Sequence, residues 1–254
     1  MKIATWNVNS LTVRLQQVVA WLNSNPVDVL CLQELKQTDE MFPKEVFQKL
    51  GYHAWWRGQK TYNGVAIISR LPGDEVVGEL PHLEDPQRRF LAVTVQGVRV
   101  VCLYIPNGGE LDSDKYAYKK QWLAALFQWL EGEYGRYPRL VVTGDYNIAP
   151  AALDVHKPAM WEATPIFSPE MQESFRQMLA MGFGDCFRTL HPQEVQYTWW
   201  DYRLGGFSRN QGLRIDHILA SPAMLSGLAS CVIDKIPRGW DRPSDHAPVV
   251  ATFE

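Results

Sequence analysis

The stretch LVVTGDYN at residues 140–147 decides the fold, because four residues of strand character run directly into a carboxylate and an amide. Three further apolar runs end in the same way: residues 3–6 lead to Asn7 and Asn9, residues 29–32 to Gln33 and Glu34, and residues 100–103 to Tyr104 and Asn107. One polar residue after a strand usually reflects turn chemistry. Four such runs indicate neighbouring strands whose polar ends converge on a shared site.

Outward from this stretch, short apolar strands alternate with amphipathic helices. Strands are predicted over Lys2–Trp6, Val27–Leu32, Gly64–Ser69, Phe90–Val95, Val98–Tyr104, Leu140–Thr143, Ile215–Ala220 and Ala247–Phe253. Helices are predicted around residues 15–22, from Pro43 to Gly51, over residues 122–130 with an end at Gly132 or Gly135, and from a Ser168 cap to Gly182. Gln96-Gly97 gives hairpin spacing, so at least one pairing is antiparallel. The pattern predicts an α/β fold of layered sheets in one domain over residues 1–254.

Composition limits the possible functions. The chain has 254 residues and a formal net charge of -3, which excludes a globally basic nucleic-acid coat and requires local patches for any polyanion. Its four cysteines show no CxxC spacing, which favours a reducing compartment. No stretch has the length of a signal peptide or a membrane span, so we expect a cytoplasmic protein without a membrane partner.

Carboxylates and amides, without Cys or clustered His, make up the predicted site. Asp216 lies inside an apolar strand, where an ionised carboxylate is costly unless it is paired, and Asp245-His246 precede the last strand. Hard oxygen ligands suit Mg²⁺ or Mn²⁺, and Mg²⁺ leaves coordination positions for water and substrate phosphate. Phosphodiester hydrolysis needs a metal, a base and hydrogen-bond donors. Candidates for the last two are His246, Asp145, Asn7, Asn147 and Tyr104.

A series of motifs extends over nearly the whole chain: TWNVNS at 5–10, DVLCLQE at 28–34, YIPNG at 104–108, GDYN at 144–147, WWDYR at 199–203, GLRIDHIL at 212–219 and PSDHAP at 243–248. With these motifs the sequence resembles the exonuclease III family of apurinic/apyrimidinic (AP) endonucleases, within the DNase I-like endonuclease/exonuclease/phosphatase superfamily. The resemblance implies a four-layer α/β sandwich, with two central mixed sheets flanked by helices and an active site at one edge.

The resemblance also implies roles for single residues. Glu34 is the expected principal metal ligand, with Asp245 and Asn9 near the ion. The expected catalytic residues are Asn7, which orients the site; Asp216, which pairs with His246; Asp145, which handles the attacking water; Asn147, which bonds a phosphate oxygen; and Tyr104, which stabilises developing charge. Either Asp145 or His246 serves as the general base, and the sequence leaves both open.

Substrate contacts follow from aromatic and basic residues. Trp199 and Leu213 resemble the family's apolar pocket for a base-free deoxyribose, and Trp240 is a candidate for insertion at the lesion. Lys60, Asn107 and Arg203 are expected to bind DNA. Half of the loop cations are expected to meet phosphates, from a set of Arg57, Lys60, Lys115, Lys119, Arg203, Arg209, Arg214 and Arg242. His156 is expected at the surface, with crowding of the site as the alternative.

These observations predict a monomeric DNA repair hydrolase that uses Mg²⁺ or Mn²⁺. It would cut the phosphodiester 5' to abasic sites in double-stranded DNA and trim 3' ends. One alternative is a phosphoesterase of the same scaffold that acts on RNA or phospholipid, which the WWDYR segment disfavours. Another is a catalytically silent DNA-binding module, which the intact set of catalytic positions disfavours.

Overall fold

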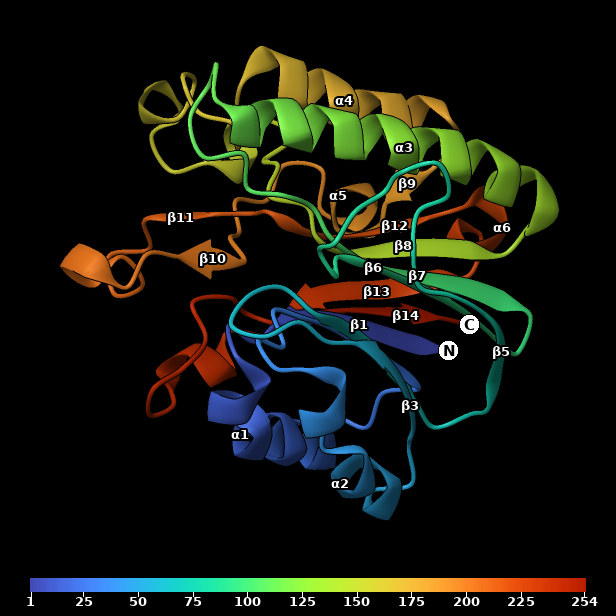
Figure 1. Ribbon diagram of the computed structural model, residues 1–254. Helices are drawn as coiled ribbons and strands as arrows, with labels where there is room; N and C mark the ends of the chain where they lie inside the picture. Colours follow the sequence, from blue (N-terminus) through green and yellow to red (C-terminus); the bar gives the residue numbers. More distant parts are fainter.

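Two six-stranded mixed sheets pack face to face between two layers of helices in the computed structural model, which describes residues 1–254 (Figure 1). The first sheet has the order β13 (Leu228–Ile233), β14 (Val249–Phe253), β1 (Lys2–Asn7), β2 (Val29–Gln33), β4 (Val65–Ser69) and β3 (His53–Arg57). The second has the order β5 (Gly73–Val77), β6 (Phe90–Val95), β7 (Val98–Tyr104), β8 (Leu140–Asp145), β12 (Asp216–Ala220) and β9 (Gly184–Asp185). This is the predicted four-layer α/β sandwich.

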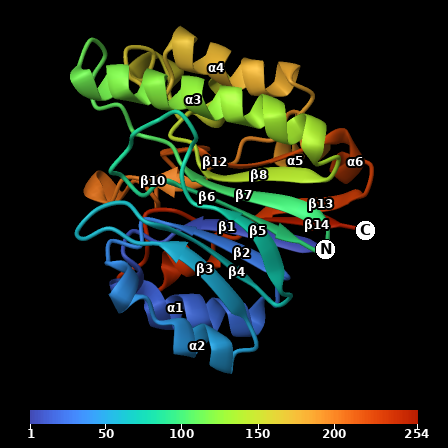
Figure 2. The ribbon, with the colours of Figure 1, turned by 45° about the vertical axis from the view of Figure 1, so that its right-hand side comes forward.

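Helices cover the outer face of each sheet, as the two views of the ribbon agree (Figures 1 and 2). The first sheet carries α1 (Leu11–Ser24) and α2 (Lys44–Lys49), and the second carries α3 (Asp114–Arg136) and α4 (Pro169–Ala180). Shorter helices are α5 (Cys186–Leu190), α6 (Pro222–Leu225) and the 3-10 turns η1 (Asp39–Met41), η2 (Ala152–Asp154), η3 (Pro158–Met160), η4 (Arg203–Gly205) and η5 (Ile236–Gly239). No helix combines the length and apolar character needed to cross a membrane.

The central strands are buried on both faces, which explains their continuous apolar runs. In β7, Val100 and Cys102 join the core between the two sheets, whereas Val101 and Leu103 face the core under α3 and α4. The inter-sheet core draws on both sheets, with Ile3 from β1 packing in the same cluster as Val100. The sheets are therefore held together by one shared apolar layer.

The elements agree with the prediction in most places and depart from it at edges. The Ser168 cap is confirmed, because its hydroxyl accepts from the Met171 amide, and the 96–97 hairpin turn has both residues at positive φ. α3 continues through Gly132 and Gly135 to Arg136, so the predicted helix end is wrong. Both glycines face open space, and the helix ends only before Pro138, which disfavours helical backbone at its predecessor. The strands β3, β5, β9 and β13 and a two-stranded ribbon were not predicted.

That ribbon pairs β10 (Trp199–Trp200) with β11 (Gly212–Leu213) and projects from one end of the sandwich, opposite the chain termini (Figure 1). Its connecting loop carries η4. The ribbon is joined to the segment before β14 by an isolated bridge between Trp199 and His246. It therefore lies directly beside the candidate site.

Candidate active site

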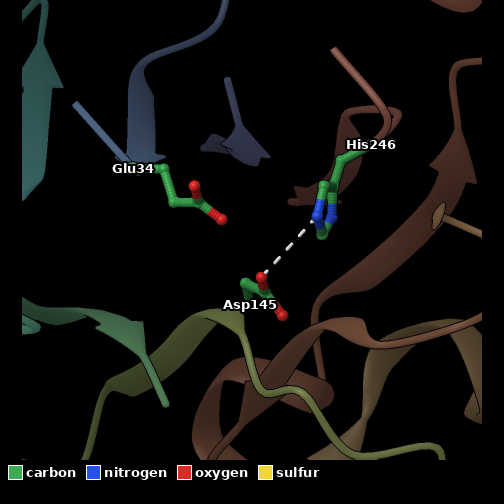
Figure 3. Close-up of side chains that lie close together, drawn as sticks. All are labelled: Glu34, Asp145 and His246. Atoms are coloured by element: carbon green, nitrogen blue, oxygen red, sulfur yellow. Dashed lines mark ion pairs between the residues drawn. The ribbon is translucent and has the colours of Figure 1, made fainter. Parts of the chain in front are cut away.

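Strand ends from both sheets meet at the edge from which the ribbon projects. β1 and β2 run parallel and end in register at Asn7 and Gln33, and Glu34 follows. In the other sheet, β7 and β8 run parallel and place Tyr104 opposite Asp145. Ligand atoms of Glu34, Asp145 and His246 lie within 4.8 Å of one another (Figure 3). The predicted convergence is confirmed in the geometry.

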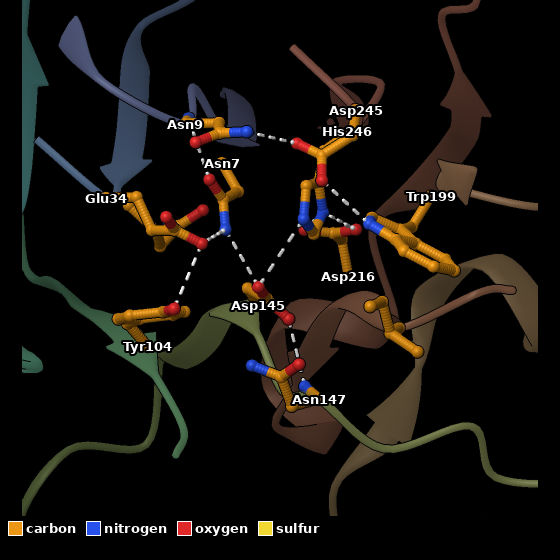
Figure 4. Close-up of polar contacts among 12 residues, drawn as sticks. Asn7, Asn9, Glu34, Tyr104, Asp145, Asn147, Trp199, Asp216, Asp245 and His246 are labelled. Carbon is orange, nitrogen blue, oxygen red and sulfur yellow. Dashed lines mark hydrogen bonds and ion pairs between the residues drawn. The ribbon is translucent and has the colours of Figure 1, made fainter. Parts of the chain in front are cut away.

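Asn7 connects the two sheets at this point. Its buried side chain donates through Nδ2 to Glu34 Oε1 at 2.9 Å and to Asp145 Oδ2 at 2.8 Å (Figure 4). Its Oδ1 accepts from the Asn9 amide at 2.9 Å. Because one amide group contacts two carboxylates from different sheets, Asn7 fixes their separation.

Glu34 is held as an anion at the mouth of the site. The Tyr104 hydroxyl donates to its Oε1 at 2.9 Å, and Lys36 Nζ lies 2.8 Å from its Oε2. Burial raises the pKa of Glu34, but the Lys36 charge and the hydrogen bonds from Lys36 and Asn7 outweigh it and leave the pKa below its usual value. Glu34 and Lys36 both have positive φ, a backbone strain of the kind found at functional sites.

Asp245 supplies a second carboxylate on the same side. Its Oδ1 accepts from Asn9 Nδ2 and its Oδ2 from Trp199 Nε1, each at 2.9 Å. Burial raises the pKa of Asp245, but the His246 charge and these two bonds lower it overall. Asp245 is therefore also ionised at neutral pH.

These oxygens fit a hard divalent cation. Lys36 Nζ lies 2.5 Å from Asn9 Oδ1 as well as 2.8 Å from Glu34, so the two oxygens already converge on a positive charge. Asn9 in turn bonds Asp245. Two carboxylates and an amide oxygen, without thiolate, match Mg²⁺ or Mn²⁺ better than Zn²⁺.

His246 and Asp216 form the expected pair. His246 Nδ1 lies 2.9 Å from Asp216 Oδ2 and 3.1 Å from its Oδ1, and Nε2 lies 3.8 Å from Asp145 Oδ2. Burial disfavours the charged ring, but the charges of Asp216 and Asp145 outweigh it and raise the pKa of His246 to about 10. The ring is therefore protonated at neutral pH, with Nδ1–H directed to Asp216.

Asp145, the carboxylate that faces His246 Nε2, has a pKa near neutral pH, whereas the pKa of His246 lies well above it. Burial raises the pKa of Asp145 to about 7, although the His246 charge and the Asn7 bond act against the shift. Its Oδ1 accepts from the Asn147 amide at 2.9 Å. A carboxylate that titrates near neutral pH is suited to take up a proton during a reaction.

The predicted phosphate-binding amides lie beside Asp145. Asn107 Nδ2 donates to Asn147 Oδ1 at 3.1 Å, and Asn147 Nδ2 donates to the Ile105 carbonyl at 2.9 Å. Lys119, one of the eight candidate cations for phosphate contacts, is fully buried and donates to the carbonyls of Asn147 at 2.7 Å and Pro165 at 2.8 Å. Its burial removes it from the candidates, and it instead holds the loops of the site together.

Arg214, another of the eight candidate cations, is likewise buried and is removed from the candidates for phosphate contact. Its Nε lies 2.7 Å from Asp154 and its Nη1 lies 2.8 Å from Asp185. Burial lowers the pKa of Arg214, but the two carboxylates raise it above its usual value overall. This ion-pair network supports β12 from within the fold, and no Arg214 atom is free for DNA.

The apolar residues predicted for a base-free sugar lie together. Trp199 pairs with Leu213 across the ribbon and packs against the cluster that contains Leu213 and Ile215. An adjoining hollow of about 670 Å³ is lined by Trp199, Trp161, Arg203 and others. His156 also lines it and is half-buried, with its Nε2 buried and unpaired.

The remaining predicted contacts lie farther out. Lys60 is exposed, and the Arg203 side chain is 85% exposed and paired with Asp201 at 2.6 Å. Trp240 packs against the core between the first sheet and α1, where it is half-buried. That packing does not favour its insertion into DNA.

Together, the sandwich and the strand-end carboxylates define a phosphoester-cleaving class of protein. Residues 4–246 match the Endonuclease/Exonuclease/phosphatase family, and the chain belongs to this family. Proteins of the family depend on a metal ion, and Glu34, which lies in one acidic group with Asp145 and His246, is the expected principal ligand for it.

Similar proteins indicate which kind of phosphoester-cleaving enzyme this chain is. The chain is 34% identical to exodeoxyribonuclease III of Haemophilus influenzae, with 100% of both chains covered. Two solved structures from Neisseria are also similar: a 3'-5' exonuclease from Neisseria meningitidis, and a 3' phosphatase bound to a product DNA hairpin. Each is 50% identical to this chain with a TM-score of 0.98, and the match covers 100% of this chain and at least 99% of the other. An AP endonuclease from Archaeoglobus fulgidus shares 38% identity with a TM-score of 0.96, covering 100% and 99%. The expected nuclease of exonuclease III type is confirmed.

Proposed function

We propose that the chain is a divalent-metal-dependent DNA repair nuclease that cuts 5' to abasic sites and removes blocking groups or nucleotides from 3' ends. The observation that carries the proposal is one geometry: Glu34, Asp145 and His246 meet within 4.8 Å, beside the Trp199–Leu213 ribbon. The relatives named as exonuclease, 3' phosphatase and AP endonuclease support both activities.

Glu34, Asn9 and Asp245 are the residues that would hold the metal, with Mg²⁺ as the first choice and Mn²⁺ as the second. When bound there, the ion supplies Lewis-acid stabilisation of phosphate charge. The Lys36 ammonium, which now contacts Glu34 and Asn9, would have to move aside or share these oxygens.

Asp145 takes the proton from the attacking water. Its pKa of about 7 leaves a large fraction ionised at neutral pH, whereas His246, with a pKa of about 10, already carries its proton. His246 therefore acts as a cation that neutralises charge on a phosphate oxygen, and Asp216 holds the ring in the required orientation.

Asn147, which follows β8, and Tyr104, which ends β7 in the second sheet, are the proposed hydrogen-bond donors to the phosphate. Asn147 is fixed by Asp145 and Asn107, and such a preorganised donor stabilises the charge that develops in the transition state at little cost in reorganisation. The Tyr104 hydroxyl donates its proton to Glu34 in this structure, so it would have to redirect that proton to a phosphate oxygen. The two side chains complete the set of donors that the pentacoordinate phosphorus requires.

The apolar side of the site selects the lesion. We assign this selection to Trp199, which lines the hollow, with the buried Leu213 paired to it across the ribbon; an abasic nucleotide also costs less to unstack than an intact one. Asn107, Lys60 and Arg203 extend the contact along the strand.

We further propose that the protein works as a monomer, and that it forms one domain because both sheets share one core. A cytoplasmic location is supported by four free, buried cysteines and by the bacterial relatives. Double-stranded DNA is the expected partner.

Cleavage of two labelled duplexes tests the proposal, one with an internal abasic analogue and one with a blocked, recessed 3' end. We expect Mg²⁺-dependent cleavage of both, abolished by EDTA and by Glu34→Gln. Glu173→Gln, which changes an exposed carboxylate on α4, should leave cleavage unchanged. Cleavage that persists in EDTA, or an intact substrate in Mg²⁺, would contradict the assignment.

A further inference from the structure

Arg238 is a buried cation enclosed by aromatic rings of the substrate-binding ribbon. It lies in η5, before the segment that carries Asp245 and His246, and only 6% of it is exposed. Its guanidinium lies 4.9 Å from the ring centre of Phe207, 5.6 Å from that of Tyr202 and 5.8 Å from that of Trp200. All three rings belong to the ribbon and its connecting loop.

The polar contacts of Arg238 are with the segment Pro243–His246, called here the catalytic segment because it carries Asp245 and His246. Its Nη1 donates to the Ser244 carbonyl, whereas its buried Nε has no partner. The Ser244 hydroxyl donates to the Asn7 carbonyl at 2.7 Å and accepts from the His246 amide at 3.2 Å. One guanidinium therefore lies against three rings of the ribbon and its loop and also donates a hydrogen bond to the catalytic segment.

The ribbon and the catalytic segment are also bonded directly. The Tyr202 hydroxyl donates to the Pro243 carbonyl at 2.7 Å, and the Trp200 amide donates to the Asp245 carbonyl at 3.0 Å. Movement of the ribbon is therefore transmitted to Asp245 and His246. Arg238 lies at this connection, where its guanidinium contacts three rings and the Ser244 carbonyl together; lysine, a compact point charge, does not reproduce that shape.

We propose that Arg238 is a positioning residue that fixes Asp245 and His246 relative to the substrate-binding ribbon. The proposal rests on the proposed function, because it assumes that these two residues act on DNA held by the ribbon. A displacement of about 1 Å at a reacting group can lower a rate by about 100-fold. Arg238 would therefore control turnover without touching the substrate.

The test compares Arg238→Met and Arg238→Lys with a matched control, Arg99→Met. Arg99 is also buried near two aromatic rings, 5.0 Å from the Tyr137 centre and 5.8 Å from the Trp129 centre, but it lies at the start of β7 and pairs with Glu133 of α3. We expect both Arg238 variants to lower kcat for the abasic duplex by about 10- to 100-fold with a smaller change in KM. Arg99→Met should lower the melting temperature but leave kcat near that of the wild type.

A double-mutant cycle with Tyr202→Phe separates positioning from general stability. Tyr202→Phe keeps the ring that faces Arg238 but removes the hydroxyl bond to Pro243 at 2.7 Å, together with the longer contacts to Asn9 at 3.4 Å and Arg14 at 3.3 Å. Because both changes release the same segment, Tyr202→Phe should have much less effect on kcat in the Arg238→Met background than in the wild type. In the Arg99→Met background its full effect should remain.

The outcomes are distinct. A wild-type protein that does not cleave either duplex overturns the proposed function itself. A wild-type protein that cleaves, together with an Arg238→Lys variant whose kcat is unchanged or a cycle that is additive, overturns the positioning role. If Arg238→Met does not fold, Arg238→Lys and its own cycle with Tyr202→Phe decide.

Discussion

Replacement of Asp216 by Asn tests the charge arrangement around His246. Asp216 contacts His246 Nδ1 at 2.9 and 3.1 Å, and its charge is the main reason that the pKa of His246 rises from 6.5 to about 10 despite burial. The attraction of the carboxylates for the imidazolium therefore exceeds the opposing effect of burial, and Asp216 is the largest favourable contribution. Loss of a paired carboxylate should lower the pKa of His246 by about 1 to 3 units.

The expected result has two parts. Loss of one charge-assisted hydrogen bond, worth about 1.5 to 3 kcal/mol, should lower kcat by about 10- to 150-fold. The alkaline limb of the pH profile, set in the wild type by the pKa of about 10, should move to lower pH because the ring loses its proton sooner. On the acid side of the profile, kcat should increase with pH through the Asp145 pKa of about 7, because the reaction requires the ionised Asp145 carboxylate.

The assay is steady-state cleavage of the abasic duplex from pH 5 to 11 in saturating metal. Asp234→Asn is the control, because Asp234 accepts from Trp21 Nε1 at 2.8 Å, outside the site. An alkaline limb that stays at the wild-type pH in Asp216→Asn would refute the assignment of that limb to His246. An unchanged kcat would refute the orienting role of Asp216.

Four further changes have defined outcomes. Asp145→Asn should reduce cleavage by more than about 100-fold while gel-shift binding of the abasic duplex persists, since it removes the proton acceptor; loss of binding instead would contradict this role. Trp199→Ala should reduce incision at the abasic analogue more than trimming of the 3' end, and equal loss in both assays would exclude a selective pocket. Mg²⁺ should raise the melting temperature of the wild type but not of Glu34→Gln, and an equal rise in both would place the ion elsewhere. Lys119→Met should lower the free energy of unfolding by about 1 to 3 kcal/mol in urea titration, because it leaves buried carbonyls unpaired; an unchanged midpoint would argue against its bridging role.

The central sheets were predictable because burial on both faces demands unbroken apolar sequence, as in Val98–Tyr104 and Leu140–Thr143. Edge strands are not buried on both faces, so their sequences need not be continuously apolar. Three of the five residues of β5 are exposed and only one of the six residues of β13 is fully buried, so neither shows a clear pattern. The end of α3 was placed too early because a glycine on an exposed helix face costs only about 1 kcal/mol, which tertiary packing outweighs.

The strand-end residues of the site were predictable from local sequence, because Asn7, Glu34 and Asp145 each follow an apolar run. Buried cations were not. Arg214 finds its Asp154 partner 60 residues away, and the rings around Arg238 lie 31 to 38 residues before it. Before the chain folds, such a loop arginine cannot be distinguished from a solvated one.

The bridge made by Asn7 ties catalysis to the completeness of the fold. Its single amide reaches a carboxylate in each half of the sandwich, so neither half on its own holds a working site. A chain still emerging from synthesis, or one partly unravelled by heat or proteolysis, would be harmless to the genome it is meant to maintain. For an enzyme that breaks DNA, the active site therefore forms only when both sheets of the sandwich are folded and packed together.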